Sequence, residues 1–191
     1  MDKDVSAGSA TASPQTLGHL ALGLTLLAFG VANTGVIDGV SAAHAAAIAT
    51  WLGGVALFVT GILAFRAGDG GSGTAFAGLG AFWFTWGIAS GPDLTAEAAG
   101  LFFLLWALLS LTLTAASAGA GVVTQGVYGL FTVALVLLGV AAFAESGGLA
   151  KAGGWIAAAA GLGAWYGATA ALAHWPTLSG RAAGRGVTAI G

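Results

Sequence analysis

Charged side chains are scarce in this sequence: Lys, Arg, Asp and Glu make up only 6% of its 191 residues. Soluble domains carry about 25% charged residues, so this chain cannot cover itself with groups that water solvates well. The net charge of −2 also leaves no basic face for nucleic acid. Hydrophobic residues reach 58% and the mean hydropathy is +0.94, which indicates a polytopic membrane protein.

Cysteine is absent, which excludes disulfides and thiolate–metal sites. The three histidines, His19, His44 and His174, lie near the ends of apolar stretches without metal-binding spacing, so we assign them to the membrane interface. No nucleophile–base pair, metal set or cofactor loop is visible. We therefore expect no enzymatic activity, no metal and no cofactor. The polar N-terminus does not resemble a signal peptide, so the first apolar span is expected to direct insertion.

Six apolar stretches approach the length of about 20 residues that a hydrocarbon core of about 30 Å requires. They are expected at about 17–37, 43–65, 74–89, 96–118, 122–143 and 149–174. Nearly all charges fall between them, as expected when a charge at the centre of a span is costly. The sequence therefore predicts an all-α membrane protein. A six-transmembrane-helix bundle occupies 16–175, with a polar tail at 1–15 and a C-terminal tail at 176–191.

Basic residues predict the orientation of this bundle. With six spans, both termini share one side, which carries four basic residues, whereas the other side carries only Lys151. The four are Lys3, Arg66, Arg181 and Arg185. The positive-inside rule then favours a multi-pass protein of the cell (inner or plasma) membrane with both termini cytoplasmic.

The segment 74–86, TAFAGLGAFWFTW, combines aromatic residues with glycines and carries no charge. On a helix, Phe76, Gly80, Trp83 and Gly87 form one stripe of alternating bulky and small residues. We expect Gly80 to let a neighbouring backbone approach, because helices in lipid associate through close packing. A tightly packed transmembrane helix and a pore wall both fit this pattern.

Uncharged polar residues are the candidates for contacts inside the membrane. We expect the hydroxyls of four threonines to bond back to carbonyls of their own helices. These are Thr25, Thr60, Thr112 and Thr132. The amide of Asn33 has more bonding capacity than its own helix can satisfy. Asn33 is therefore interpreted either as a substrate or pore contact or as a link between helices.

Several motifs together resemble the acetate uptake transporters, the family of bacterial succinate–acetate permeases and fungal acetate permeases. They are SPQTLG at 13–18, NTG at 33–35, TAFxxxGxFW at 74–83, AGGW at 152–155 and AWY at 164–166. The resemblance covers nearly the whole chain. One motif departs from the family pattern: Ser13 replaces an asparagine and Thr16 replaces a proline, so one side-chain amide is missing.

The resemblance implies a homo-hexamer of six-helix protomers, each protomer with its own path for acetate and similar monocarboxylates; succinate is a further candidate. It implies a hydrophobic constriction at Leu22, Leu79 and Phe131, which are bulky residues among small neighbours. The substrate path is expected to include four further residues: Asn33, Thr34, Phe76 and Trp83. A hexameric channel for urea or small amides and a non-transporting membrane scaffold remain alternatives.

A bare carboxylate pays a very large desolvation cost in hydrocarbon. Less than about 1% of such an acid is protonated at pH 7, because its pKa lies near ~4–5. Passage therefore either follows an anion channel or uses the scarce neutral acid, and the sequence leaves both open.

Overall fold

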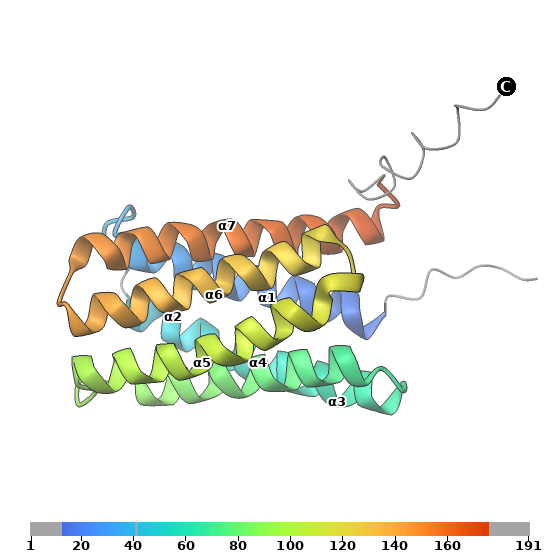
Figure 1. The fold of residues 1–191 in the computed structure, drawn as a ribbon, viewed down its shortest axis with the longest axis horizontal. Coiled ribbons are helices and arrows are strands. Elements are labelled where there is room, and N and C mark those ends of the chain that lie inside the picture. Colours follow the sequence, from blue (N-terminus) through green and yellow to red (C-terminus); the bar gives the residue numbers. More distant parts are fainter. Residues whose placement is uncertain (1–12, 41, 176–191) are drawn as a thin grey trace, which may run out of the picture.

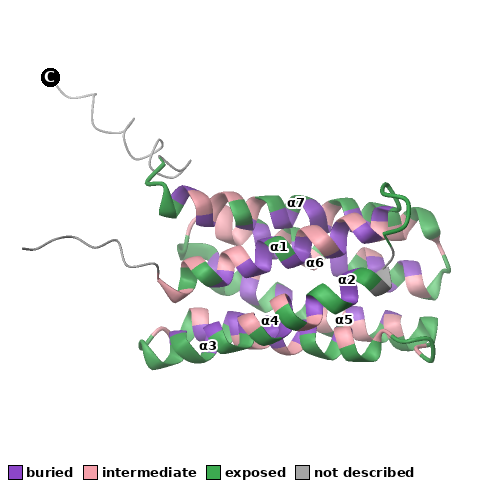
Figure 2. Cartoon of the chain, turned by 180° about the vertical axis from the view of Figure 1, so that it is seen from behind, coloured by how far each residue is buried: buried purple, intermediate pink, exposed green. Residues whose placement is uncertain are grey.

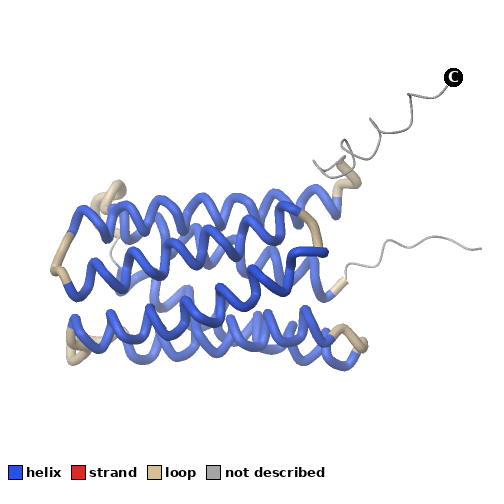
Figure 3. The backbone as a smooth tube through the Cα atoms, in the orientation of Figure 1, coloured by secondary structure: helices blue, strands red, loops and turns tan. Residues whose placement is uncertain are grey.

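The computed structural model describes residues 13–40 and 42–175, and every regular element in these residues is helical (Figure 3). The elements are α1 (Pro14–Thr34), α2 (Ala42–Ile48), the π-helix η1 (Ala49–Ala56), α3 (Leu57–Arg66), α4 (Gly70–Ala89), α5 (Ala96–Ala116), the 3-10 turn η2 (Ser117–Gly119), α6 (Val122–Phe143) and α7 (Gly147–Leu172). Because α2, η1 and α3 follow without a break, they form one rod. The expected tails lie outside the described residues except for 13–15, where Ser13 caps α1 and positions 14 and 15 belong to that helix.

Helix caps explain where the observed boundaries differ from the predicted ones. Asp69 accepts a hydrogen bond from the Ser72 N–H (3.0 Å), so α4 begins at Gly70 rather than at 74. The Ser146 hydroxyl accepts from the Leu149 N–H and starts α7 at Gly147. Gly35 adopts a left-handed conformation (φ 66°), which ends α1 at Thr34 instead of 37.

The rods pack as a ring in the order α1, α7, α6, α5, α4 and α3, and η1 and α3 close the ring against α1. Figure 1 shows them lying nearly parallel along the long axis of the molecule. In Figure 2, buried positions concentrate along the faces between rods, while exposed positions cover the outer faces and the ends. The interior of this ring is a single cluster of buried apolar residues.

Four rods are long and apolar enough to cross a membrane, namely Pro14–Thr34, His44–Arg66, Ala96–Gly119 and Val122–Phe143. The glycine-rich helices α4 and α7 run alongside them but are not in this set. Exposed leucines, valines and phenylalanines cover the outside of the ring. The prediction of an all-helical membrane protein is confirmed, whereas the count of six spans stays a prediction.

Helices α1 and α7 approach each other closely through glycines. A Cβ placed on Gly30 would overlap the backbone of Ala158, and one on Gly154 would lie 2.8 Å from the Gly30 carbonyl oxygen. Further along, a Cβ on Gly161 would lie 2.7 Å from the backbone nitrogen of Leu27. These contacts bring the two backbones together over several turns, as small residues do between helices in lipid.

The stripe predicted on α4 packs against the rod that contains η1 and α3. A Cβ on Gly80 would lie 2.6 Å from the Phe58 nitrogen, so the predicted close approach of a neighbouring backbone is confirmed. On the other side of this interface, a Cβ on Gly53 would lie 2.7 Å from Trp83 Cγ. The missing side chain at Gly53 therefore makes the space that the Trp83 ring occupies.

The four threonines behave as predicted. Each hydroxyl donates to the carbonyl four residues earlier: Thr25 to Ala21, Thr60 to Ala56, Thr112 to Leu108 and Thr132 to Tyr128, at 2.7 to 2.9 Å. A different polar contact joins two helices, because the buried Ser110 hydroxyl of α5 donates to the Tyr128 carbonyl of α6 (3.0 Å).

Candidate functional site

Cavities bordered by polar side chains lie at both ends of the ring. Two of them, of about 240 and 280 Å³, lie at the end where α1, α4 and α6 begin, which we call the Gln15 end. Both are lined by Gln15, His19, Ala120 and Thr124. A third cavity of about 280 Å³ lies where α1 and α6 end, which we call the Asn33 end. These volumes suit small solutes, because pockets for drug-sized ligands begin at about 300 Å³.

An acid and an amide meet at the Gln15 end. The Gln15 amide donates to one carboxylate oxygen of Asp69. Hydrogen bonds from the Ser72 side chain and backbone, and then from Gln15, hold the pKa of Asp69 below its usual range. Ser13 and Thr16, which replace the family's asparagine and proline, instead cap α1 together, with 3.1 Å between their hydroxyl oxygens. Gln15 thus brings a side-chain amide back to the region where the missing asparagine would have supplied one.

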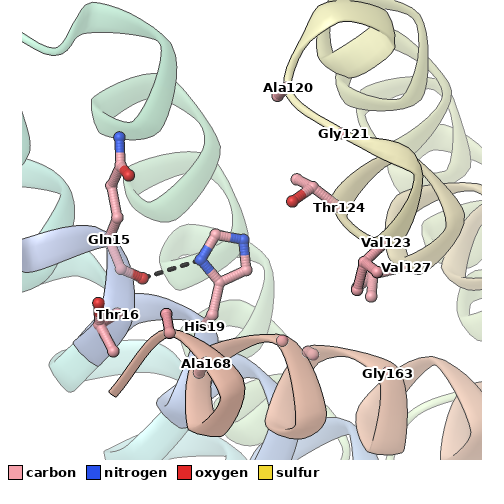
Figure 4. Close-up of a pocket in the computed structure, with 13 residues that line it drawn as sticks. Gln15, Thr16, His19, Ala120, Gly121, Val123, Thr124, Val127, Gly163 and Ala168 are labelled. Atoms are coloured by element: carbon pink, nitrogen blue, oxygen red, sulfur yellow. Dashed lines mark hydrogen bonds between the residues drawn. The ribbon is translucent and has the colours of Figure 1, made fainter. Parts of the chain in front are cut away.

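His19 lies one turn further along α1 and points into the space bounded by Ala120 and Thr124 (Figure 4). Its Nδ1 lies 2.8 Å from the Gln15 carbonyl oxygen, the contact drawn in Figure 4. The ring meets the edge of Phe76 at 5.2 Å between centroids. His19 thus lies near the end of its rod, where an interfacial role was predicted, and the helical phase of α1 turns its ring toward the cavity.

Asn33 lines the cavity at the opposite end together with Glu145 and Ser146. Its amide nitrogen donates to the Phe29 carbonyl of its own helix (2.8 Å), so this hydrogen bond does not link helices. Thr34, expected on the same path, donates to the Val31 carbonyl (2.6 Å) and does not line this cavity. Of these two sequence candidates, Asn33 alone borders the cavity at this end.

The predicted constriction residues Leu22, Leu79 and Phe131 are all buried, with 0%, 1% and 1% of their surfaces exposed. They belong to one core cluster, which also contains Phe76 and Trp83 from the predicted path. On α1, α4 and α6, the residues that line the cavities of the Gln15 end come first. Leu22, Leu79 and Phe131 lie further along these helices, toward the opposite end of the ring. The structure thus brings the residues from α1, α4 and α6 together inside the ring.

Aromatic rings from three helices fill the middle of this core. Trp83 stacks on Phe131 (5.8 Å between centroids, 19° between planes) and meets Phe29 edge-on at 5.2 Å. Phe29 was not predicted from the sequence, although it lies seven residues, or two helical turns, beyond Leu22 on α1. We call Leu22, Phe29, Leu79, Trp83 and Phe131 the apolar plug.

One polar atom in the plug has no partner. The Trp83 Nε1 is buried and makes no hydrogen bond with any described residue. A buried donor without a partner costs about 1–3 kcal/mol, so most such groups in proteins are paired. Trp83 therefore presents a free N–H inside an otherwise apolar stretch between the two ends.

Comparison with known proteins agrees with this architecture. Residues 4–177 match the GPR1/FUN34/yaaH family. Over 156 residues the chain is 27% identical to the succinate-acetate/proton symporter SatP of Escherichia coli K12, covering 76% of this chain and 80% of that protein, and the SatP of Shigella flexneri gives the same values. The solved structure of a bacterial acetate channel SatP superposes with a TM-score of 0.76 at 26% identity, covering 94% of this chain and 99% of that one. The chain belongs to the GPR1/FUN34/yaaH family.

Proposed function

We propose that the protein carries acetate and similar small monocarboxylates across the membrane, each protomer passing its substrate through its own apolar plug. The observation that carries this proposal is the pair of small cavities at opposite ends of the ring, each bordered by polar side chains and separated by five buried side chains of the plug. The kinship with acetate and succinate-acetate transport proteins supports the substrate class. In this closed arrangement the plug excludes hydrated solutes by size and dewetting.

Shortening a plug side chain tests the proposal directly. We expect Leu79→Ala and Phe131→Ala to raise the flux of labelled acetate into proteoliposomes and to admit larger acids that the wild type rejects. Leu111→Ala is the matched control, because Leu111 is exposed on the outer face of α5 and should leave the selectivity unchanged. If both plug variants transport as the wild type does, the assignment of the plug is wrong.

The charged residues around the cavities indicate whether the substrate passes as the carboxylate anion or together with a proton. Asp69 borders a cavity at the Gln15 end and Glu145 borders the one at the Asn33 end, and no Lys or Arg is among the residues lining these cavities. Nearby carboxylates disfavour a second negative charge. This arrangement supports passage in which a proton accompanies the acid over passage of the bare anion. Acetate flux that increases as the pH falls, at constant total acetate, is the expected result.

Two other functions give different results in the same assay. A urea or small-amide channel moves urea and acetamide, and urea then competes with acetate. A non-transporting scaffold moves none of these solutes above the rate of empty liposomes. Flux of acetate that urea does not inhibit supports the carboxylate path over both alternatives.

The proposed setting is the cell membrane, with six spans per protomer, both termini cytoplasmic, six protomers per assembly and no enzymatic activity. Arg66 lies at the Gln15 end and Lys151 at the Asn33 end, which supports a cytoplasmic Gln15 end. The broad apolar outer face of the ring is suited to lipid and to neighbouring protomers. Labelling of single cysteines at Gly68 and Gly148 with an impermeant reagent on whole cells tests the orientation, because only the second is expected to react.

A further inference from the structure

His19 has three properties to which the proposed transport path assigns no role. It lines both cavities of the Gln15 end. Its ring is fixed on one side by the Gln15 carbonyl and on another by the edge of Phe76. Its second nitrogen, Nε2, is buried and has no hydrogen-bond partner among the described residues.

The Gln15 contact determines which nitrogen of His19 carries hydrogen. A carbonyl oxygen only accepts hydrogen bonds, so Nδ1 at 2.8 Å must be the N–H donor. In the neutral ring, Nε2 then bears a lone pair, and in the charged ring it bears a second N–H. The neutral form accepts a hydrogen bond from a ligand, whereas the charged form donates one.

We infer that His19 Nε2 is the carboxyl-binding group of the Gln15 end and that it binds a small carboxylic acid together with one proton. This inference rests on the proposed transport function. The acid O–H donates to the neutral Nε2, or equivalently the carboxylate accepts from the protonated Nε2–H. Both descriptions contain the same atoms and the same net charge, so the proton only changes its position between oxygen and nitrogen.

The neighbours of His19 favour this way of binding. The titratable side chains that line the same cavities are Asp69 and Tyr128, and no Lys or Arg lines either cavity. Asp69 is already bonded to Gln15 and Ser72. Among the groups lining these cavities, His19 is therefore the one whose neutral ring offers a nitrogen lone pair to an acid proton. The Thr124 hydroxyl, which lines the same space, is available for the second carboxyl oxygen.

Histidine NMR provides the first test. The full chain is labelled with ¹⁵N-histidine in lipid nanodiscs and titrated with acetate near pH 7.5. We expect the Nε2 signal of one histidine to move from the position of a lone-pair nitrogen toward that of a protonated nitrogen, and the Nδ1 signal to stay protonated. The signal is assigned by its loss in His19→Gln. Acetamide has no carboxyl proton and is the control ligand, which should leave the signal near its starting position.

Proton uptake provides the second test. Calorimetry in buffers of different ionisation enthalpy should show uptake of about one proton per acetate bound by the wild type. In His19→Gln the amide still donates to a carboxylate but cannot take up a proton, so uptake should fall nearly to zero while binding persists. His174→Asn is the matched control, because His174 is exposed, lines neither cavity and has a left-handed backbone that asparagine tolerates (φ 55°).

Acetate binding without proton uptake, no detectable acetate binding, or equal uptake in the wild type and His19→Gln would each overturn the inference. Acetate flux in proteoliposomes separates this result from the proposed function. If the wild type transports acetate and His19→Gln keeps the same KM and pH profile, only the role of His19 fails. If the wild type binds acetate with proton uptake and transports none, the site stands and the transport proposal fails.

Discussion

At the scale of single residues, the polar side chains that border the cavities lie near helix ends, where hydropathy does not predict which way a side chain points. Leu22, Leu79 and Phe131, predicted as a constriction, are buried, as bulky residues among small ones are when they fill space between helices. Their role as a constriction stays a prediction. The inward direction of His19 could not be predicted, since a residue near a helix end faces lipid, water or core according to the rotation of its helix. The link between Gln15 and Asp69 joins residues 54 positions apart and has no local pattern.

Trp83→Phe separates two roles of the indole in the plug. If the free Nε1–H donates to the carboxyl group in transit, its removal should lower acetate flux by about tenfold or more, the equivalent of ~1.5 kcal/mol. If the ring only fills space, the smaller phenyl group should raise flux instead. Trp86→Phe, on the same helix, controls for the loss of ring volume. Flux is measured in proteoliposomes at equal protein density.

Asp69→Asn tests the cap of α4 through its pH dependence. The pKa of Asp69 is lowered in the folded protein, so its charge stabilises the fold fully at pH values above the ordinary value of about 3.9. That contribution is lost as the pH falls through the lower folded pKa. We expect the wild type to unfold at a higher temperature than Asp69→Asn near neutral pH, and the gap to close in acid.

Asp93→Asn, in the loop before α5, removes the same charge elsewhere and is the control for the acid titration. A gap between the wild type and Asp69→Asn that widens in acid would contradict the proposed stabilisation. Thermal unfolding is followed by circular dichroism in detergent.

At the scale of helices, the sequence predicted the rods well and their ends less well. Apolar length located all six helical rods, because each is bounded by loops that hold nearly all of the charges. The ends were displaced by up to four residues where a polar side chain caps a helix, as Asp69 does. The π-helix η1, which packs against α4, was not predicted, because apolar composition alone does not distinguish a π-helix from an α-helix.

Gly30→Ala should weaken the α1–α7 interface. The added methyl group would overlap the Ala158 backbone, which cannot move aside as a side chain can, so we expect a loss of roughly 1–3 kcal/mol. Gly126→Ala is the matched control on α6, where no atom lies within 4 Å of the added Cβ. That change should stabilise the helix by roughly 0.5–1 kcal/mol. Thermal unfolding in detergent measures both, and equal stability of the two variants would contradict the packing argument.

At the scale of the whole molecule, the ring of rods brings together residues that are distant in the sequence. The plug takes its side chains from α1, α4 and α6, none of which neighbours another in the ring order. No single helix could therefore have shown the plug: Leu22, Leu79 and Phe131 were predicted from the resemblance, whereas Phe29 was not predicted. The two ends remain chemically distinct, with an amide, an imidazole and Asp69 at one and Asn33 with Glu145 at the other.

The outer surface leads to a prediction about assembly. Large apolar side chains, such as Leu105 and Leu108 on α5, are exposed along the ring in the protomer. We expect native mass spectrometry of the detergent-released protein to show six copies of the 18.4 kDa chain. A charged residue at Leu105 or Leu108 should then reduce the assembly if that face joins protomers. A monomer under conditions that preserve acetate transport would contradict the hexamer.

The joint between α4 and α5 differs from the glycine-packed seam of α1 and α7. Here the rods meet through flat rings, with Phe82 stacked on Phe102 at 5.4 Å and Trp86 against Phe103 at 4.5 Å. Rings can slide and tilt over one another without disturbing any main-chain hydrogen bond. The α4–α5 wall therefore packs through side chains and the opposite α1–α7 wall through backbones. We expect any widening of the interior to occur on the α4–α5 side, where Trp83 and Phe131 contact Phe82.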